Sequence, residues 1–465
     1  MSKKLLDHFQ STQLSIEERF ASGKKLRDKF PRIKQGEYKP AANRVDPISI
    51  LEEQAKTRIP DLVPVRYARM LASPFAFLRG GAAIMAADLA ANSKTTEINV
   101  QACGDMHIAN FGVFASAERN LVFGINDFDE TLPGPWEWDL KRLVASVVAA
   151  GRFLGVNKSK CEESVMTAVS TYRKKIRQYA NMGNLELWYS TINENDILKS
   201  LTPAARIGAE KIMSKARQRT HMQVLGKLSD LVDEKYLLKE NAPFIVREKK
   251  TQSGRPIKEA IGLFFESYFT SLADDRRKLL KQYRVVDVAR KVVGVGSVGT
   301  RCWIIFLIGN HSNDPLFLQL KEAQPSVLEP YLSKSIYSNQ GQRVVAGQRL
   351  IQGAPDIFLG WGEIDGMQYY VRQLRDMKGG VEFDPKKVKT ENMDQYSSLC
   401  AWALALAHAK SGDAAMIAGY AGKSDELDKA MVNFAFAYAD QTEKDYQALA
   451  AAAKSGRIKV ASVKE

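Results

Sequence analysis

The chain is poor in the residues that build metal clusters and disulfide frameworks. Its 465 residues include only four cysteines, which are far apart and form no C-x-x-C pair, so neither a zinc ribbon nor a set of disulfides is expected. We predict free buried thiols in a reducing compartment. The five histidines include no His-x-His, which leaves a two-metal hydrolase short of ligands. The cysteines are Cys103, Cys161, Cys302 and Cys400, and the histidines are His8, His107, His221, His311 and His408.

Long apolar runs are also missing. No stretch approaches the roughly 18 apolar residues of a membrane span, and the first 20 residues lack the apolar core of a signal peptide. We therefore expect a cytoplasmic protein without a membrane partner. The formal net charge of +14 favours anionic partners, but a nucleic-acid role would rest on that charge alone and is not predicted.

The alternation of patterns along the chain predicts an α+β fold. Apolar residues make up 45% of the chain, enough for a large core and two or three compact units. Short strands and tight loops are expected from residue 98 to about 129, and helices from there to about 282. We divide the chain into a helical segment (1–97), a unit of short strands and helices (98–284), a strand-rich unit (285–380) and C-terminal helices (381–465).

A glycine-rich loop lies in the strand-rich unit. Gly294, Gly296 and Gly299 form a G-x-G-x-x-G with Ser297 inside it, and "TRCWIIFLI" follows. In a dinucleotide-binding fold the glycines would open a helix, but these β-branched and aromatic residues favour a strand. A glycine loop between two strands is typical of the flap that covers nucleotide phosphates in protein kinases. The next predicted strand, "PLFLQLKEA", ends near Lys321, which is the expected partner of the phosphates.

Carboxylates and an amide cluster in a second stretch. In "CGDMHIANFG", Asp105 and Asn110 are five residues apart, the spacing of a base and a magnesium-binding amide on a kinase catalytic loop. "INDFDE" follows an apolar strand and puts Asp127-Phe128 where kinases have Asp-Phe-Gly, with Asp129 in place of the glycine as a further or indirect metal ligand. Asp139 opens a helix, and its carboxylate is expected to brace the Asp105 loop by accepting backbone N–H bonds.

These motifs support a resemblance. "GDMHIAN", "NDFDE" and "WDL" are similar to the motif series of aminoglycoside and small-molecule kinases of the protein-kinase-like superfamily. "RMLASPFAFLRG" and "AHAKSGDAAMIAGYAG" look more closely like an uncharacterised bacterial family, a domain of unknown function placed near those kinases, over roughly residues 45–450. The resemblance implies a two-lobed fold that binds ATP with Mg²⁺ or Mn²⁺. It makes Asp105 the base, Asn110 and Asp127 the metal ligands, and Lys321 the phosphate lysine.

The order of the motifs departs from the kinase pattern. Kinases place the glycine loop before the catalytic loop, whereas here residue 294 follows residue 105, so we expect a circularly permuted chain. The helix at 397–413 would then lead into the catalytic loop, and core or capping roles are expected for its His408 and Asp413. Glu322 and Glu329 are the candidate acidic partners of Lys321. The 105–130 and 285–321 segments should face each other across a cleft between a strand-rich and a helical lobe.

The predicted function is transfer of phosphate from ATP to the hydroxyl of an unidentified small molecule or protein. Two alternatives keep the fold: a pseudokinase or scaffold without transfer, and an enzyme that transfers AMP. A third, a two-metal phosphoesterase, would use the Gly309-Asn310-His311 sequence, which also reads as a β-turn.

Overall fold

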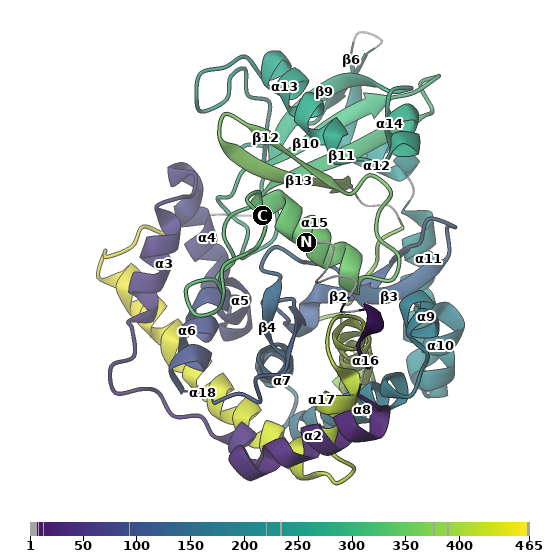
Figure 1. Ribbon diagram of the computed structural model, residues 1–465. Coiled ribbons are helices and arrows are strands. Elements are labelled where there is room, and N and C mark those ends of the chain that lie inside the picture. The colour runs from purple at the N-terminus through teal and green to yellow at the C-terminus, as the bar shows by residue number, and fades with distance from the viewer. Residues whose placement is uncertain are drawn as a thin grey trace.

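A six-stranded antiparallel sheet forms one end of the molecule, and helices form the other (Figure 1). The computed structural model describes residues 7–462 apart from residues 8, 13, 93, 220, 233, 234, 375, 376, 388 and 389. The strand order in the sheet is β12-β13-β11-β10-β9-β8. Its strands are β8 (Ile245–Val246), β9 (Arg284–Lys291), β10 (Cys302–Ile308), β11 (Pro315–Glu322), β12 (Gly360–Ile364) and β13 (Met367–Gln373).

Both faces of this sheet are covered, which explains why the central strand β10 is apolar throughout. Every residue of β10 is buried. Alternate side chains of a strand point to opposite faces. Ile305 packs on the side of α13 (Ile257–Thr270), and Ile304 packs on the side of α12 (His221–Leu228). The sequence therefore shows continuous apolar runs here and not the alternation of a half-exposed sheet.

Four long helices form the core of the other end. They are α7 (Trp136–Phe153), α8 (Lys158–Ala180), α16 (Met393–Ser411) and α18 (Glu426–Lys454), and α8 packs against the other three. The remaining helices of the described chain are α2 (Ile16–Lys29), α3 (Pro47–Ala55), α4 (Val63–Met70), α5 (Pro74–Gly80), α6 (Ala82–Asn92), α9 (Asn184–Tyr189), α10 (Glu194–Ser200), α11 (Pro203–Gln218), α14 (Asp274–Leu280), α15 (Gln340–Ile351) and α17 (Ala414–Ala421).

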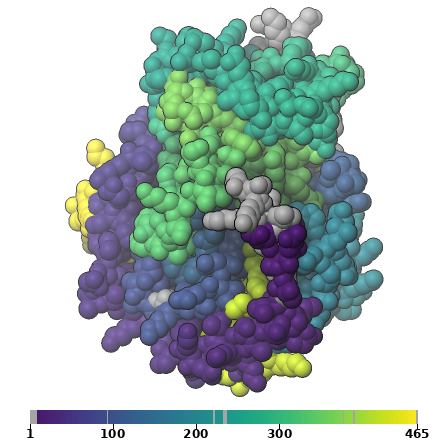
Figure 2. Space-filling model, in the orientation of Figure 1, coloured from purple at the N-terminus to yellow at the C-terminus, as the bar shows by residue number. Residues whose placement is uncertain are grey.

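The N-terminal and C-terminal parts of the chain meet at the helical end, where α2 lies on α17 (Figure 2). A Cβ on Gly23 would lie 2.0 Å from Met416 O, and one on Gly419 would lie 2.2 Å from Phe20 O. Glycine at both positions therefore allows the two backbones to touch. Arg27 reinforces the contact by donating a hydrogen bond of 2.9 Å to Tyr420 O.

Two small sheets position the loops of the candidate site. β1 (Asn99–Ala102) pairs with β4 (Leu132–Pro135), and β3 (Leu121–Ile125) pairs with β2 (Phe111–Ala115) and β5 (Ile192–Asn193). The loop at residues 103–110 joins β1 to β2, and the loop at 126–131 joins β3 to β4. Helix α15 lies between these small sheets and the six-stranded sheet (Figure 1).

The structure confirms the α+β class and most predicted elements, including the hairpin turn at Asp365-Gly366, where both residues have positive φ. The expectation that helical segments continue to about residue 282 holds for α8 to α14 but is wrong for the strands between them. β6 (Ser229–Val232) and β7 (Lys235–Leu238) form a hairpin there, and β8 joins the large sheet. Leu238 is buried against that sheet, so tertiary contacts, and not local propensity, decide this segment. Among the described helices none is both long and apolar enough to cross a bilayer alone; α5 and α6, bent by 77° at their junction, pass that test only as a pair.

Candidate functional site

The loop at residues 103–110 is anchored by Asp139 of α7. Asp139 Oδ2 accepts a hydrogen bond from Cys103 N at 2.6 Å, and Oδ1 accepts one from Gly104 N at 2.9 Å. Gly104 has φ +76°, and a Cβ there would lie 2.6 Å from Glu130 O, so glycine is needed in this turn. The two N–H bonds predicted for Asp139 are confirmed.

Behind Asp139 lies His408 of α16. Its Nε2 is 3.4 Å from Asp139 Oδ2, and its Nδ1 is 2.8 Å from the hydroxyl of Tyr172. His408 is fully buried, as its predicted core role requires, and Asp413 caps α17 by accepting a hydrogen bond from Met416 N. The four cysteines are also buried and free.

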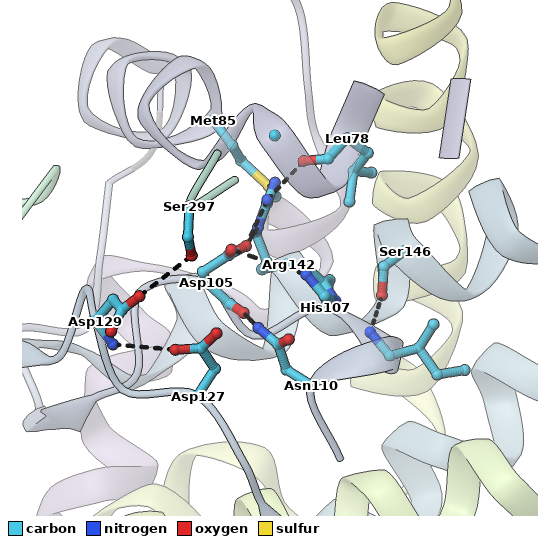
Figure 3. Close-up of polar contacts among 12 residues, drawn as sticks. Leu78, Met85, Asp105, His107, Asn110, Asp127, Asp129, Arg142, Ser146 and Ser297 are labelled. Atoms are coloured by element: carbon cyan, nitrogen blue, oxygen red, sulfur yellow. Dashed lines mark hydrogen bonds and ion pairs between the residues drawn. The ribbon is translucent and has the colours of Figure 1, made fainter. Parts of the chain in front are cut away.

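Asp105 projects from the same loop and is paired with Arg142 (Figure 3). Arg142 Nε and Nη2 donate to Asp105 Oδ1 at 2.9 and 2.6 Å, and His107 Nε2 lies 3.8 Å from the other carboxylate oxygen. Burial raises the pKa of Asp105, although Arg142 opposes that rise. Burial, together with the charges of Arg79 and Arg142, holds the pKa of His107 well below its usual range, so this imidazole is neutral.

Asn110 and Asp127 lie beside Asp105 in Figure 3. Asn110 Nδ2 donates to Asp105 O at 2.7 Å, which fixes the orientation of the amide, and Asn126 N donates to Asn110 O at 2.9 Å, which ties the two loops together. Burial acts to raise the pKa of Asp127, but neighbouring cations, Lys321 foremost, outweigh it and lower the pKa. Asp127 is therefore an ionised carboxylate at neutral pH.

Lys321, on β11 of the large sheet, reaches this second loop. Its Nζ lies 3.7 Å from Asp127 Oδ1 and 2.5 Å from Asp129 Oδ2, although Asp129 is 192 residues away in the chain. The lysine is 2% exposed; burial acts to lower its pKa, but the two carboxylates raise it well above the usual value. Tyr370 donates its hydroxyl to the other oxygen of Asp129. The predicted encounter of the two segments is confirmed.

The acidic partner of Lys321 is thus Asp129, whereas Glu322 and Glu329 were the candidates. Glu322 instead pairs with Arg301, whose Nη1 is 3.0 Å from its Oε2. Neighbouring side chains of a strand point to opposite faces, so residues 321 and 322 cannot reach the same cluster. Because Lys321 and Glu322 are consecutive in a predicted strand, the sequence alone could have excluded Glu322 as the partner of Lys321.

The glycine loop joins β9 to β10, as predicted, and lies over the two carboxylate loops. Gly294 and Gly299 have φ values of +66° and +92°, a region that glycine enters without strain. A Cβ on Gly296 would lie 3.2 Å from Arg79 O, so the loop also packs closely on α5. Ser297 Oγ lies 3.5 Å from Asp129 Oδ2 (Figure 3), so this part of the loop approaches the carboxylate that pairs with Lys321.

Residues of both carboxylate-bearing loops and of the glycine loop line one cleft of about 1270 Å³: Asp105, His107, Asn110, Asp127, Asp129, Gly294, Gly296 and Ser297. Three arginines from the segment before β1, none of them predicted as site residues, line it too: Arg58, Arg66 and Arg79. Arg142 was not predicted either. Asp139 and Arg142 are one helical turn apart, so a helix that presents Asp139 to the loop also presents Arg142, and this spacing was a usable signal. The three cleft arginines had no comparable signal, because only the tertiary fold brings them to the loop.

The Gly309-Asn310-His311 sequence lies away from the cleft. It forms the turn between β10 and β11, where Gly309 N donates to Asp314 O at 2.9 Å. Lys321, whose partner across the two strands is Cys302, lies at the opposite end of β10 and β11. At the usual rise per residue this end is about 20 Å from the turn. Within the described residues, no group of three or more histidine, cysteine or carboxylate side chains is arranged to hold a metal ion. The sequence on which the two-metal phosphoesterase alternative depended is therefore a β-turn outside the cleft.

Comparison with known proteins gives a family and no activity. No curated protein matches the chain, and no solved structure matches it. A family model described as an uncharacterized protein conserved in bacteria (DUF2252) matches residues 58–452, a range that includes the 103–110 loop, the glycine loop and Lys321. The chain belongs to this bacterial family, DUF2252.

Proposed function

We propose that this protein is an ATP-dependent phosphotransferase with a circularly permuted, protein-kinase-like fold. The observation that carries the proposal is the contact of Lys321 with Asp127 and Asp129. Two segments that are remote in sequence meet at this contact. One is the unit of β9, the glycine loop, β10 and β11, which carries Lys321, and the other is the loop that carries Asp127 and Phe128. In kinases the same parts bind the phosphates of ATP and their magnesium ion.

The order of elements supports the permutation. From β9 the chain runs through the glycine loop, β10, β11 with Lys321, helix α15, and the hairpin β12–β13 before it enters α16. A kinase chain follows this order in its smaller lobe and then enters its helical lobe. In our proposal the catalytic loop, which would come next, is supplied by residues 103–110, and α16 supports it through His408 and Asp139.

One difference from kinases concerns the lysine. Kinases pair it with a glutamate of the following helix, but α15 has the sequence QGQRVVAGQRLI and contains no acid. Asp129 occupies that role here. Arg343 of α15 instead donates to Asp129 O at 2.8 Å and to Thr131 O at 2.7 Å, so the helix still holds the loop in place.

The donor set fits a hard divalent cation. Asp127 supplies an ionised carboxylate and Asn110 an amide oxygen, ligands that suit Mg²⁺ or Mn²⁺. Both oxygens of Asp129 are engaged by Lys321 and Tyr370, so we assign the cation to Asp127 and Asn110 and not to Asp129. When bound, the cation would neutralise charge on the phosphates of ATP.

The chemistry follows from the position of Asp105. The acceptor hydroxyl oxygen forms a bond to the γ-phosphorus, the bond from that phosphorus to the bridging oxygen of ADP breaks, and the hydroxyl proton passes to Asp105. Arg142 occupies one Asp105 oxygen and orients the carboxylate, and the neutral His107 adds no charge that would make the carboxylate less basic. Positioning and proton acceptance are the expected contributions of such a site.

AMP transfer and a pseudokinase without transfer are alternatives that would use the same site, and one experiment distinguishes both from phosphate transfer. Purified protein is incubated with Mg²⁺, a small-molecule extract and a protein extract, using ATP labelled either at the γ-phosphate or at the α-phosphate. Label passing to an acceptor only from the γ-position supports phosphate transfer. Label passing from the α-position indicates AMP transfer, and binding of ATP without transfer of either label indicates a pseudokinase.

A further inference from the structure

The cleft is lined by three arginines, Arg58, Arg66 and Arg79, that form no salt bridge with the residues the structure describes. Arg58 and Arg66 are 8% and 1% exposed, and Arg79 is half-buried. Arg66 Nε and Nη1, Arg58 Nε and Arg79 Nε are buried without a hydrogen-bond partner. Burial lowers the pKa of each of these arginines.

The carboxylates that act on these arginines have other partners: Asp105, which acts on Arg79, is paired with Arg142. Of the acids, Glu130 has the largest electrostatic effect on Arg58, but burial raises the pKa of Glu130 to about 7, and its Oε2 accepts a hydrogen bond from Val327 N at 2.8 Å. Glu322 is held by Arg301. A buried cation without a partner is costly. We therefore expect these arginines, of which Arg58 and Arg66 are close enough to repel each other, to be paired with an anion from outside.

Arg58 contacts a part of the glycine loop that follows the residue next to the Lys321 site. Ser297 approaches Asp129, which pairs with Lys321. The next residue, Val298, contacts Arg58 instead: its carbonyl oxygen accepts a hydrogen bond of 2.5 Å from Arg58 Nη1. Gly299 packs against the Arg58 side chain. The cleft of about 1270 Å³ exceeds the roughly 300–1,000 Å³ of a typical small-molecule site, so it has room for a second substrate beside a nucleotide.

We propose that Arg58, Arg66 and Arg79 form an anion site for the acceptor, which is then a hydroxyl compound carrying a phosphate or carboxylate group. This inference rests on the proposed function, because it assigns the lysine cluster to ATP and the arginines to the acceptor. Arg79 connects the two, since its charge acts on Asp105 and its carbonyl borders the glycine loop at Gly296. An anion held there would place the rest of the acceptor near Asp105.

Inorganic phosphate and citrate serve as probes of the two anion chemistries. Their binding to the full chain is measured by calorimetry, alone and in the presence of a saturating non-hydrolysable ATP analogue with Mg²⁺. We expect at least one probe to bind while the analogue is bound. Arg79→Gln should weaken that probe by about tenfold or more, the loss expected for a charged hydrogen bond, and leave the analogue's affinity unchanged. Arg79→Lys, which keeps the charge, should give an intermediate value and guards against misfolding of the first variant.

Arg276→Gln, on exposed α14, is the matched control and should change neither affinity. Displacement of both probes by the ATP analogue, failure of both to bind, or an unchanged probe affinity in Arg79→Gln would overturn the acceptor site and leave the proposed function standing. Failure of the analogue to bind, with probe binding intact, would overturn the proposed function and with it the assignment of the anion to an acceptor.

Discussion

Asp139 and Arg142 lie one turn apart on α7 and hold the same loop in two ways: Asp139 accepts the backbone N–H groups of residues 103 and 104, and Arg142 holds the side chain of Asp105. The backbone path and the carboxylate orientation are therefore set by one helix. This arrangement separates what keeps the loop folded from what orients its reactive group, so the two roles can be tested by different variants.

Asp105→Asn tests the proposed base. Asparagine keeps the size of the side chain but cannot take a proton, and positioned bases contribute roughly 10²–10⁴-fold to a rate. We expect transfer from ATP to fall by about that factor, while affinity for ATP with Mg²⁺ stays the same because Lys321, Asp127 and the glycine loop are intact. Label transfer and calorimetry measure the two quantities, and an undiminished rate would exclude Asp105 as the base.

Lys321→Met should weaken nucleotide binding. It removes the cation that faces the phosphates, so we expect both ATP affinity and turnover to fall, as measured by calorimetry and label transfer.

Asp127→Ala tests the metal assignment. It removes the main metal ligand, so ATP affinity should lose its dependence on Mg²⁺. Titrations with and without Mg²⁺ measure this dependence; if Asp127→Ala retained it in full, the metal assignment would be wrong.

Asp139→Ala should destabilise the protein because one buried and one partly buried N–H group, those of Cys103 and Gly104, lose their acceptor. At roughly 1–3 kcal/mol for each unsatisfied group, we expect the free energy of unfolding to fall by about 3 kcal/mol in urea titrations. Asp413→Ala is the control: it removes a helix cap, worth about 1 kcal/mol, and a partly exposed ion pair with Arg19, which contributes little. Equal losses in the two variants would show that Asp139 is no more than a cap.

Glu130 should make stability depend on pH. Its pKa is raised to about 7, so the folded state binds more protons than the unfolded state between about pH 4.5 and 7. The contribution of this group therefore lowers stability as pH rises through that window, by at most roughly 3 kcal/mol. Glu130→Gln should gain stability relative to the parent as pH increases from 5 to 8, measured as the difference between the two proteins. A constant difference would mean that Glu130 titrates normally.

Local pattern was enough to predict the parts of the site. The glycines before a β-branched run predicted a loop between strands, and the spacing of Asp105 and Asn110 predicted their common loop. The approach of Lys321 to Asp127 was also predictable, because the two motifs were assigned to one phosphate site and must then lie close together. Whether these parts bind ATP stays a prediction.

Other features depend on tertiary structure and were not predictable. Arg58, Arg66 and Arg79 belong to a segment of ordinary helical appearance, and only the packing of that segment on the glycine loop brings them into the cleft. The β6–β7 hairpin was missed for a similar reason, because burial against the large sheet decides its conformation. Asp129 was expected at the metal, and only the geometry of Lys321 and Tyr370 reveals its partners.

The backbone contact of α2 with α17 has a practical consequence for trimming the chain. The family match begins at residue 58, yet α2 lies before that point and covers the small-residue face of α17 through Gly23 and Gly419. A shortened protein spanning 58–452 would expose this face and lose the Arg27 bond to Tyr420 O. Such a fragment should express poorly or self-associate, so the boundary of sequence similarity is not the boundary of the folding unit.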